Sequence, residues 1–209
     1  MRRLEKFRPP LESGDRLTRE EFHCRYSEYP EIKKAELVEG VVYVGGRVRT
    51  TAHGEPHALV VGWLGLYAAE KPDLHVANST TVFLDERNEV QPDAVLLRFE
   101  PGVVRETEDD FVEGAPQLIV EVALSSASYD LHDKKEAYRR SRVREYVVLR
   151  TLDDALDWFE LRDGAYARRE PDERGIIESG QFPGLRLHVP SLLARDAAGV
   201  IGALGPSSA

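Results

Sequence analysis

Three side chains of this sequence have types and positions suited to chemistry. Asp93 follows Pro92 at the start of an apolar segment, and Glu121 lies inside the apolar run 118–124. Lys134 lies further along, on a segment with helical character. A carboxylate is costly to bury unless a metal ion, a basic group or a hydrogen-bond network compensates its charge. Because such groups concentrate in functional sites, we take Glu121 as the centre of a candidate site.

Each of these residues also has a purely structural explanation. Glu121 would face water if its strand lay at the edge of a sheet. Asp93 could complete a turn after proline, as expected for Asp73 in another Pro-Asp pair of the sequence. Asp130, Lys134 and Tyr138 recur at helical spacing and share one helix face, which is also typical of a solvated helix whose N-cap is Asp130. The residue types alone leave both interpretations open.

Apolar periodicity and turn signals predict the elements that would position these side chains. The segment 117–124 is almost continuously apolar and is expected to be a strand buried on both faces. The segment 100–114 is expected to be a charged, mobile loop, and Gly62 and Gly65 are expected to let a neighbour approach their helix. We expect helices at 18–26, 55–70 and 131–141, and strands at 35–38, 41–44, 74–77, 81–84, 90–98, 117–124, 145–149, 156–161, 165–169 and 185–189.

The order of these elements predicts a mixed α/β fold around a sheet. The chain has 209 residues, enough for one well-buried domain. We expect that domain to cover residues 17–195, between a flexible arm at 1–16 and a frayed tail at 196–209. No apolar run has the roughly 20 residues of a membrane span, no secretory signal is evident, and Cys24 is the single cysteine. These features favour a cytoplasmic protein without a membrane association.

The net charge of −9 bears on possible partners. A protein that grips long duplex DNA usually carries an evident basic surface, so any phosphate-binding face must be local or assisted by metal ions. The segment 134–150 concentrates basic residues, either as a solvated helix face or as such a patch. The candidate nucleic-acid contacts are Lys135, Arg139 and Arg142.

Taken together, the motifs resemble those of the Uma2 family, also called DUF820, which is placed among the PD-(D/E)XK nucleases. The similarity extends over roughly residues 17–195 and depends on order and spacing rather than on a single motif. Its elements are Glu36–Gly40, His57, Pro92-Asp93, the run from Gly114 to Val122, Ser125, the Asp130–Lys134–Tyr138 spacing, the run from Val143 to Tyr146, Asp163-Gly164 and the run from Phe182 to Leu185.

The resemblance implies a restriction-endonuclease-like core, in which a mixed β-sheet is flanked by helices and extended by an N-terminal and a C-terminal hairpin. It implies metal-dependent hydrolysis of phosphodiester bonds in nucleic acid, with DNA as the expected substrate. Mg²⁺ or Mn²⁺ is the expected cofactor, without an organic cofactor. A homodimer is expected because cutting both strands favours two sites related by a twofold axis.

The resemblance also assigns roles. Asp93, Glu121 and Lys134 would be catalytic, and the metal would be held by Asp93, Glu121 and the backbone carbonyl of Val122. The lysine of an ordinary Glu-x-Lys motif would fall at Ala123, so Lys134 is expected to replace it. Its neighbour Lys135 lies about 100° around the helix, so both lysines cannot face the site equally. The supporting candidates are Glu36, His57, Gln91, Asp130 and Tyr138.

Two alternatives remain at this level. The chain could be a nuclease-fold protein that binds nucleic acid or a protein partner without cutting. It could also be a structural or regulatory dimer whose acidic site binds a metal only for stability. The catalytic interpretation requires Asp93, Glu121 and Lys134 to converge in space.

Overall fold

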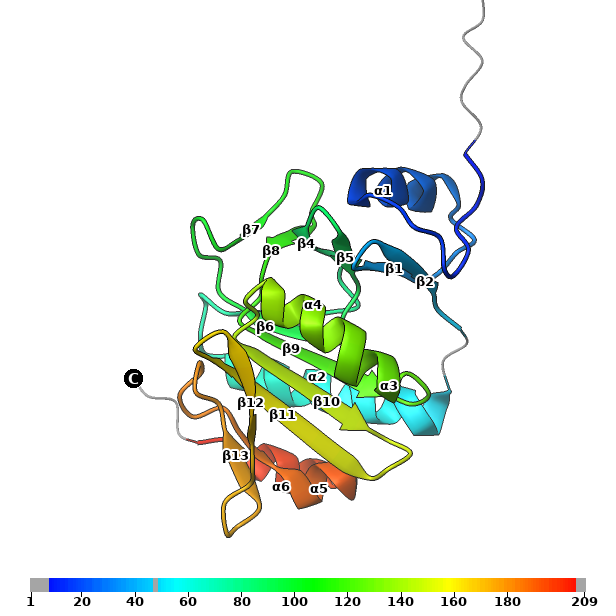
Figure 1. Cartoon of the computed structure of the whole chain (residues 1–209). Coiled ribbons are helices and arrows are strands. Elements are labelled where there is room, and N and C mark those ends of the chain that lie inside the picture. Colours follow the sequence, from blue (N-terminus) through cyan, green and yellow to red (C-terminus); the bar gives the residue numbers. More distant parts are fainter. Residues whose placement is uncertain (1–7, 47–48, 206–209) are drawn as a thin grey trace, which may run out of the picture.

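The computed structural model describes residues 8–46 and 49–205. Within these ranges the strands form two six-stranded sheets and one two-stranded sheet, with helices packed against them (Figure 1). No helix in this part of the chain combines the length and the apolar character needed to cross a membrane.

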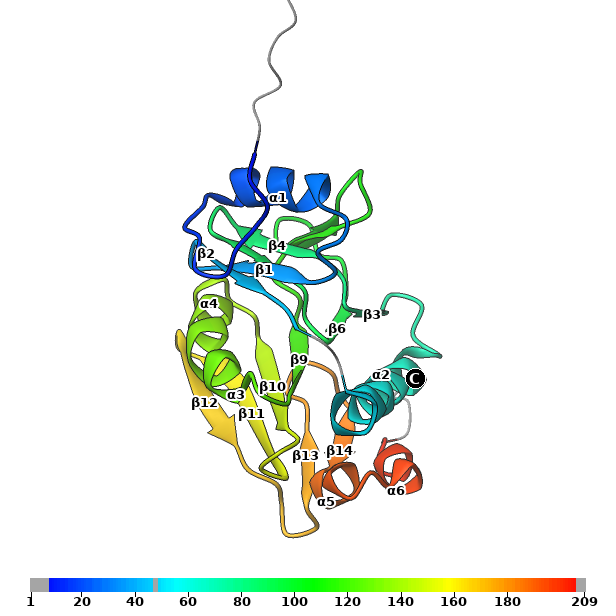
Figure 2. The ribbon, with the colours of Figure 1, turned by 90° about the vertical axis from the view of Figure 1, so that its right-hand side faces the viewer.

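The main sheet has the strand order β12-β11-β10-β9-β6-β3. Only β9 and β10 run parallel within it, and the segment that joins them contains the helices α3 and α4. Figures 1 and 2 show these helices on one face of the sheet and α2 on the other. The strands are β3 (His75–Asn78), β6 (Ala94–Leu97), β9 (Leu118–Ala123), β10 (Glu145–Arg150), β11 (Ala155–Arg162) and β12 (Ala165–Arg169).

Strand β9 is buried along its whole length, as its apolar run predicts. Leu118, Val120 and Val122 belong to the core beside α2 (Glu55–Ala68), whereas Ile119 and Ala123 belong to the core on the opposite face. Since side chains alternate along a strand, Glu121 points to the face that carries α3 and α4.

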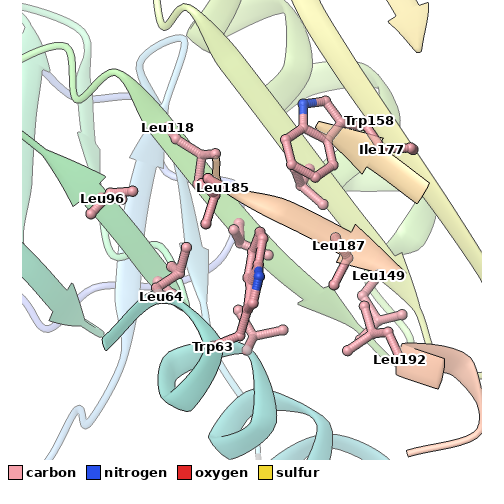
Figure 3. Packing of buried hydrophobic residues seen from close by; sticks show 14 of the residues in the cluster. Trp63, Leu64, Leu96, Leu118, Leu149, Trp158, Ile177, Leu185, Leu187 and Leu192 are labelled. Atoms are coloured by element: carbon pink, nitrogen blue, oxygen red, sulfur yellow. The ribbon is translucent and has the colours of Figure 1, made fainter. Parts of the chain in front are cut away.

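The core beside α2 is anchored by two tryptophans. The rings of Trp63 on α2 and Trp158 on β11 lie 6.2 Å apart in an edge-to-face arrangement, and leucines from the sheet and the C-terminal segment surround them (Figure 3). The predicted close approach at Gly62 and Gly65 is wrong, because a Cβ at either position would meet no atom within 4 Å. Trp63, Leu64 and Tyr67 of this helix are buried, whereas Gly62 is exposed and Gly65 is partly exposed.

The second six-stranded sheet lies beside the main one and has the order β2-β1-β5-β4-β8-β7. Helix α1 (Arg19–Glu28) starts at the predicted cap, where Thr18 accepts from the N–H of Glu21, and packs Phe22 against the hairpin β1-β2. The predicted hairpin β1-β2 forms as expected, and it lies at one edge of this six-stranded sheet. The strands are β1 (Ala35–Val38), β2 (Val41–Val44), β4 (Val82–Asp85), β5 (Asn88–Val90), β7 (Val104–Glu106) and β8 (Val112–Gly114).

The single strand predicted at 90–98 is wrong. Strand β5 ends at Val90 in the second sheet, and β6 begins at Ala94 in the main sheet. Pro92 lies between them, and it cannot continue a ladder because it has no N–H. This crossing places Asp93 at the junction of the two sheets.

The predicted mobile loop at 100–114 is also wrong, because it contains the antiparallel strands β7 and β8. Strand β7 lies at the edge of its sheet, where charged residues are common. The charged composition of this segment therefore did not distinguish a strand from a loop. Gly114 has φ +98°, and a Cβ there would overlap the carbonyl oxygen of Val103. Glycine therefore permits the close approach that ends this hairpin.

The helix predicted at 131–141 starts earlier. It consists of α3 (Ala127–Tyr129), a π-helical turn at Asp130–Lys134 and α4 (Lys135–Arg140) in direct succession. Asp130 is therefore inside the helical segment and is not its N-cap. Single π-helical turns often occur at functional sites, and this one carries both Asp130 and Lys134.

The described residues near each end of the chain are packed against the fold, which the sequence did not predict. Within the described part of the arm, Leu11 is buried and the N–H of Gly14 donates to the carbonyl of Val42, so residues 8–16 pack on the hairpin. At the other end Val200 is fully buried, so residues 197–202 are not frayed. Residues 1–7 and 206–209 lie outside the described residues. The C-terminal elements are β13 (Ile176–Glu178), β14 (Arg186–His188), α5 (Val189–Leu193) and α6 (Ala197–Gly202).

Candidate active site

Asp93 is held at the junction between the sheets by contacts to both of its oxygens. Its Oδ2 accepts a hydrogen bond of 2.8 Å from the backbone N–H of Val122 and lies 3.3 Å from His53 Nε2. Its Oδ1 lies 3.4 Å from Lys34 Nζ. Because Val122 directly follows Glu121, the backbone contact connects the two candidate carboxylates across two strands.

Glu121 is buried, with 2% of its surface exposed. Its strand β9 lies between β10 and β6, so the edge-strand explanation does not apply. Its Oε1 accepts hydrogen bonds from Lys134 Nζ at 2.7 Å and from the Tyr138 hydroxyl at 2.8 Å. The buried carboxylate thus has the charged and polar partners that its position demands.

Lys134 is the buried cation of the site, and it contacts three carboxylates. Besides Glu121, its Nζ lies 2.8 Å from Glu36 Oε1 and 3.9 Å from Asp130 Oδ1. The neighbouring Lys135 points elsewhere, with its Nζ 3.7 Å from the centroid of the Phe159 ring. Of these two lysines, the structure directs Lys134 to the carboxylates.

The charges of this cluster do not balance. Four carboxylates, those of Glu36, Asp93, Glu121 and Asp130, are contacted by two lysines, Lys34 and Lys134. If these carboxyl groups and both lysines were ionised, the lysines would compensate two of the four negative charges. A group with excess neighbouring charge of its own sign titrates away from its ordinary range.

Burial and these neighbouring charges together shift the pKa values of Glu121 and Asp93. Burial raises the pKa of Glu121 to about 8, and the charges of Asp93, Asp130 and Glu36 add to the effect while Lys134 opposes it. Burial acts to raise the pKa of Asp93, but His53, Lys34 and the Val122 N–H hold it well below its usual range. Two carboxyl groups of one site thus have widely separated pKa values, which is typical of a functional centre.

The lysines remain charged despite their burial. Burial acts to lower the pKa of Lys134, but Glu121, Glu36 and Asp130 raise it well above the ordinary lysine value. Burial likewise opposes the charge of Lys34, and the nearby carboxylates of Glu36, Glu121 and Asp93 still raise its pKa.

A pocket of about 340 Å³ opens onto these groups. It is lined by the end of the hairpin β1-β2 with Arg49 and His53, and by the end of β9 with Ser125, Ser126 and Tyr129. Asp93, Glu121 and Lys134 all line it, so the convergence required by the catalytic interpretation is present.

The predicted supporting residues differ in which groups of the site they contact. Glu36 and Asp130 contact Lys134, and Tyr138 contacts Glu121. His57 Nε2 lies 2.6 Å from the main-chain oxygen of Asp93, so it positions the backbone at the junction. The Gln91 side chain turns away to the Tyr26 and Thr81 hydroxyls, while its backbone N–H donates to Glu36 at 2.8 Å.

The structure does not bring the predicted nucleic-acid contacts to the pocket. Lys135 lies over Phe159, and Arg139 is held by Glu136 and by the carbonyl of Gly164. Arg142 is exposed beyond the end of α4. These residues lie on the outer side of the helix, where several arginines are ion-paired.

Lys34, His53, Arg49 and Tyr129 line the pocket and are absent from the sequence prediction. For two of these residues, the spacing in the sequence indicates a position near the site. Lys34 is two residues before Glu36 and so shares its face of an extended chain. His53 is four residues before His57 along helical backbone, and their rings are 5.7 Å apart.

Among the described residues, no group of three or more His, Cys, Asp or Glu side chains is arranged to hold a metal ion. Mg²⁺ usually takes one or two carboxylates together with waters and substrate phosphate, rather than a cage made of protein alone. Asp93 and Glu121 fit that smaller set.

Comparisons with known proteins identify the family and the fold of the chain. The model of the Uma2 family, described as "Putative restriction endonuclease", matches residues 19–190. A search of curated proteins finds no match. A crystal structure from Anabaena variabilis ATCC 29413, titled as a putative nuclease belonging to DUF820, is similar with a TM-score of 0.62 and 10% sequence identity, over 81% of this chain and 97% of that chain.

The structural similarity confirms the predicted restriction-endonuclease-like fold, with mixed sheets flanked by helices. The family match covers most of the chain, from α1 to the start of α5. The matched region includes every residue of the cluster around Lys134. Because it extends over far more than half of the chain, the chain belongs to the Uma2 family of restriction-endonuclease-like proteins.

Proposed function

We propose that the protein is a divalent-metal-dependent endonuclease that hydrolyses phosphodiester bonds in DNA. One observation carries the proposal: Asp93, Glu121 and Lys134, which come from three separate elements, meet in one open pocket. Family membership independently favours a nuclease that acts on nucleic acid.

The donor set of the pocket fits a hard cation such as Mg²⁺ or Mn²⁺. Asp93 and Glu121 supply carboxylate oxygens, which such ions prefer. An N–H and a C=O of one strand residue face the same neighbour, so the Val122 carbonyl belongs to the side of β9 that faces Asp93. A divalent ion would also supply the two positive charges that the four carboxylates lack.

When bound, the ion would acidify a water molecule and offset charge on the phosphate. The protein side chains would then orient the reaction. Hydrogen bonds from Val122 and Tyr138 fix Asp93 and Glu121 in place. Lys134 lies against Glu121, where its ammonium would orient the attacking water or stabilise the negative charge that develops on the phosphate.

A duplex substrate would require a cut in each strand, so we propose that the protein acts as a homodimer with two such sites. The phosphate backbone would enter on the open side of the pocket, where Arg49 is exposed and Lys34 is partly exposed. This local positive charge is compatible with the overall charge of −9.

The test is cleavage of plasmid DNA, single-stranded DNA and RNA with Mg²⁺, with Mn²⁺ and with a chelator. We expect metal-dependent cutting of DNA that falls at least about 100-fold in Asp93→Asn and Glu121→Gln, the scale of losing a group that acts in the transition state. Asp73→Asn is the matched control, because Asp73 also follows a proline and its side chain is exposed.

Two results would count against this function. Purified protein that cuts none of the substrates in either metal would remove the enzyme proposal. So would Asp93→Asn or Glu121→Gln variants that cut as fast as the unaltered protein. Metal binding that depends on Glu121 without any cleavage would instead support a protein that binds nucleic acid and does not cut it.

A further inference from the structure

Lys34 is a second lysine of the pocket, and it differs from Lys134 in how firmly it is held. Among the described residues, its Nζ has a single carboxylate within 4 Å, Asp93 Oδ1 at 3.4 Å. Lys134 has three carboxylate neighbours, two of them within 2.8 Å. The Lys34 side chain is 35% exposed, against 2% for Lys134. Lys134 is therefore held firmly by several buried carboxylates, whereas Lys34 can leave its carboxylate and bind another group.

The surrounding chain directs Lys34 into the pocket. The residue immediately precedes β1, and its carbonyl accepts a hydrogen bond of 2.8 Å from the N–H of Gly45 at the end of β2. A Cβ at Gly45 would lie 3.0 Å and 3.2 Å from Lys34 Cβ and Cγ. The hairpin end thus packs directly on the aliphatic stem, which leaves the ammonium group on the pocket side.

We propose that Lys34 occupies Asp93 in the metal-free protein and moves to a phosphate oxygen of the substrate when a divalent cation takes that carboxylate. The inference rests on the proposed function, because it assigns Asp93 to the metal. It adds a second substrate-contacting lysine, distinct from Lys134, and an order of events in which metal binding prepares the phosphate site.

The physical reason is competition between like charges. A divalent cation on Asp93 repels an ammonium group at the same carboxylate, and the repulsion is strong in a partly buried site. In the part of the chain that the structure describes, no second carboxylate lies within 4 Å of Lys34 Nζ, and Glu36 and Glu121 act on its charge only from a greater distance. A phosphodiester oxygen at the pocket mouth is then the partner that restores its charge pairing, and lysine binds phosphate as a flexible point charge.

The first measurement is Mn²⁺ affinity in the absence of nucleic acid, followed by calorimetry or by the resonance signal of free Mn²⁺. We expect Lys34→Met to bind Mn²⁺ about tenfold more tightly than the unaltered protein, because a competing positive charge is removed. Lys34→Arg, which keeps the charge, should bind like the unaltered protein. Lys33→Met is the matched control, since Lys33 is exposed and its Nζ bonds the carbonyl of Pro30.

The second measurement is binding of a short DNA duplex in saturating Ca²⁺, used in place of Mg²⁺ to limit cutting. Lys34→Met should bind the duplex about tenfold more weakly. The slope of log affinity against log salt concentration should become shallower by about 1, which corresponds to the loss of one phosphate contact. Lys33→Met should stay within about twofold of the unaltered protein.

The outcomes separate this inference from the function on which it rests. If Mn²⁺ binds, and binding is lost in Glu121→Gln but unchanged or weaker in Lys34→Met, the metal site stands and the role of Lys34 is wrong. If Lys34→Met binds Mn²⁺ more tightly and DNA equally well, the transfer to phosphate is wrong. If the unaltered protein binds no Mn²⁺, the metal site and this inference both fail.

Discussion

The backbone N–H of Val122 donates a hydrogen bond of 2.8 Å to Oδ2 of Asp93. This bond joins the end of β9 to the segment that crosses between the two sheets, beyond the last paired residues of β6 and β9. It places Asp93 beside the residue that follows Glu121. The Asp93 carboxylate is therefore positioned by a main-chain group of β9, whereas Glu121 is held by the side chains of Lys134 and Tyr138.

Tyr138→Phe tests whether the tyrosine hydroxyl positions Glu121. We expect a loss of about 1–2 kcal/mol in the free energy of unfolding, because a buried carboxylate oxygen loses a donor. Cleavage should also fall about tenfold. Tyr166→Phe is the matched control, since its hydroxyl bonds the Val143 carbonyl at 2.9 Å away from the pocket. An equal loss of cleavage in both variants would assign Tyr138 to stability alone.

Lys134→Met should be strongly destabilising. Removing one partner from a buried ion pair leaves the others uncompensated and typically costs about 3–5 kcal/mol, and here three carboxylates lose their shared cation. Lys135→Met should cost about 1 kcal/mol or less, the scale of its contact with the Phe159 ring. Denaturant unfolding checks both, and similar losses would contradict the assignment of Lys134 to the cluster.

Divalent metal should stabilise the folded protein. At a concentration 100 times its dissociation constant, a ligand adds about 2.7 kcal/mol, which corresponds to a Tm increase of roughly 5–10 °C for a chain of this size. Thermal unfolding with Mn²⁺ and with a chelator measures the effect. Asp93→Asn should lose the increase and Asp73→Asn should keep it. An increase that survives in Asp93→Asn would place the metal elsewhere.

Glu145 supplies a pH dependence of stability away from the active site. Burial raises its pKa, although hydrogen bonds from Ser179 and the N–H of Gly180 oppose the shift. The unfolded chain ionises first, near pH 4.3, so the folded state binds more protons between the two pKa values. The contribution of this group to stability is thus complete below pH 4 and is lost as pH rises through the folded pKa.

Glu145→Gln isolates this effect. The stability of the unaltered protein relative to the variant should be greatest near pH 4, fall as pH rises, and level off above the folded pKa. Denaturant unfolding from pH 4 to pH 8 measures the difference at each pH. A difference that grows with pH would show that the folded state favours the ionised form.

Local sequence patterns determined much of the fold. The cap at Thr18, the hairpin between β1 and β2 and the hairpin β11-β12 depend on contacts within short segments, and each forms as predicted. The continuous apolar run of β9 likewise reports burial on both faces. The motif order also identified the family and the three central residues that meet in the pocket.

Tertiary structure decided the rest, because the remaining contacts join residues distant in sequence. The path from β5 to β6 depends on which sheet each strand enters, and periodicity carries no such information. Lys34 and His53 reach Asp93 only because the hairpin and the start of α2 meet at the junction of the sheets. Residue types alone show which groups can carry charge, whereas the contacts of four carboxylates with two lysines arise only in the folded chain.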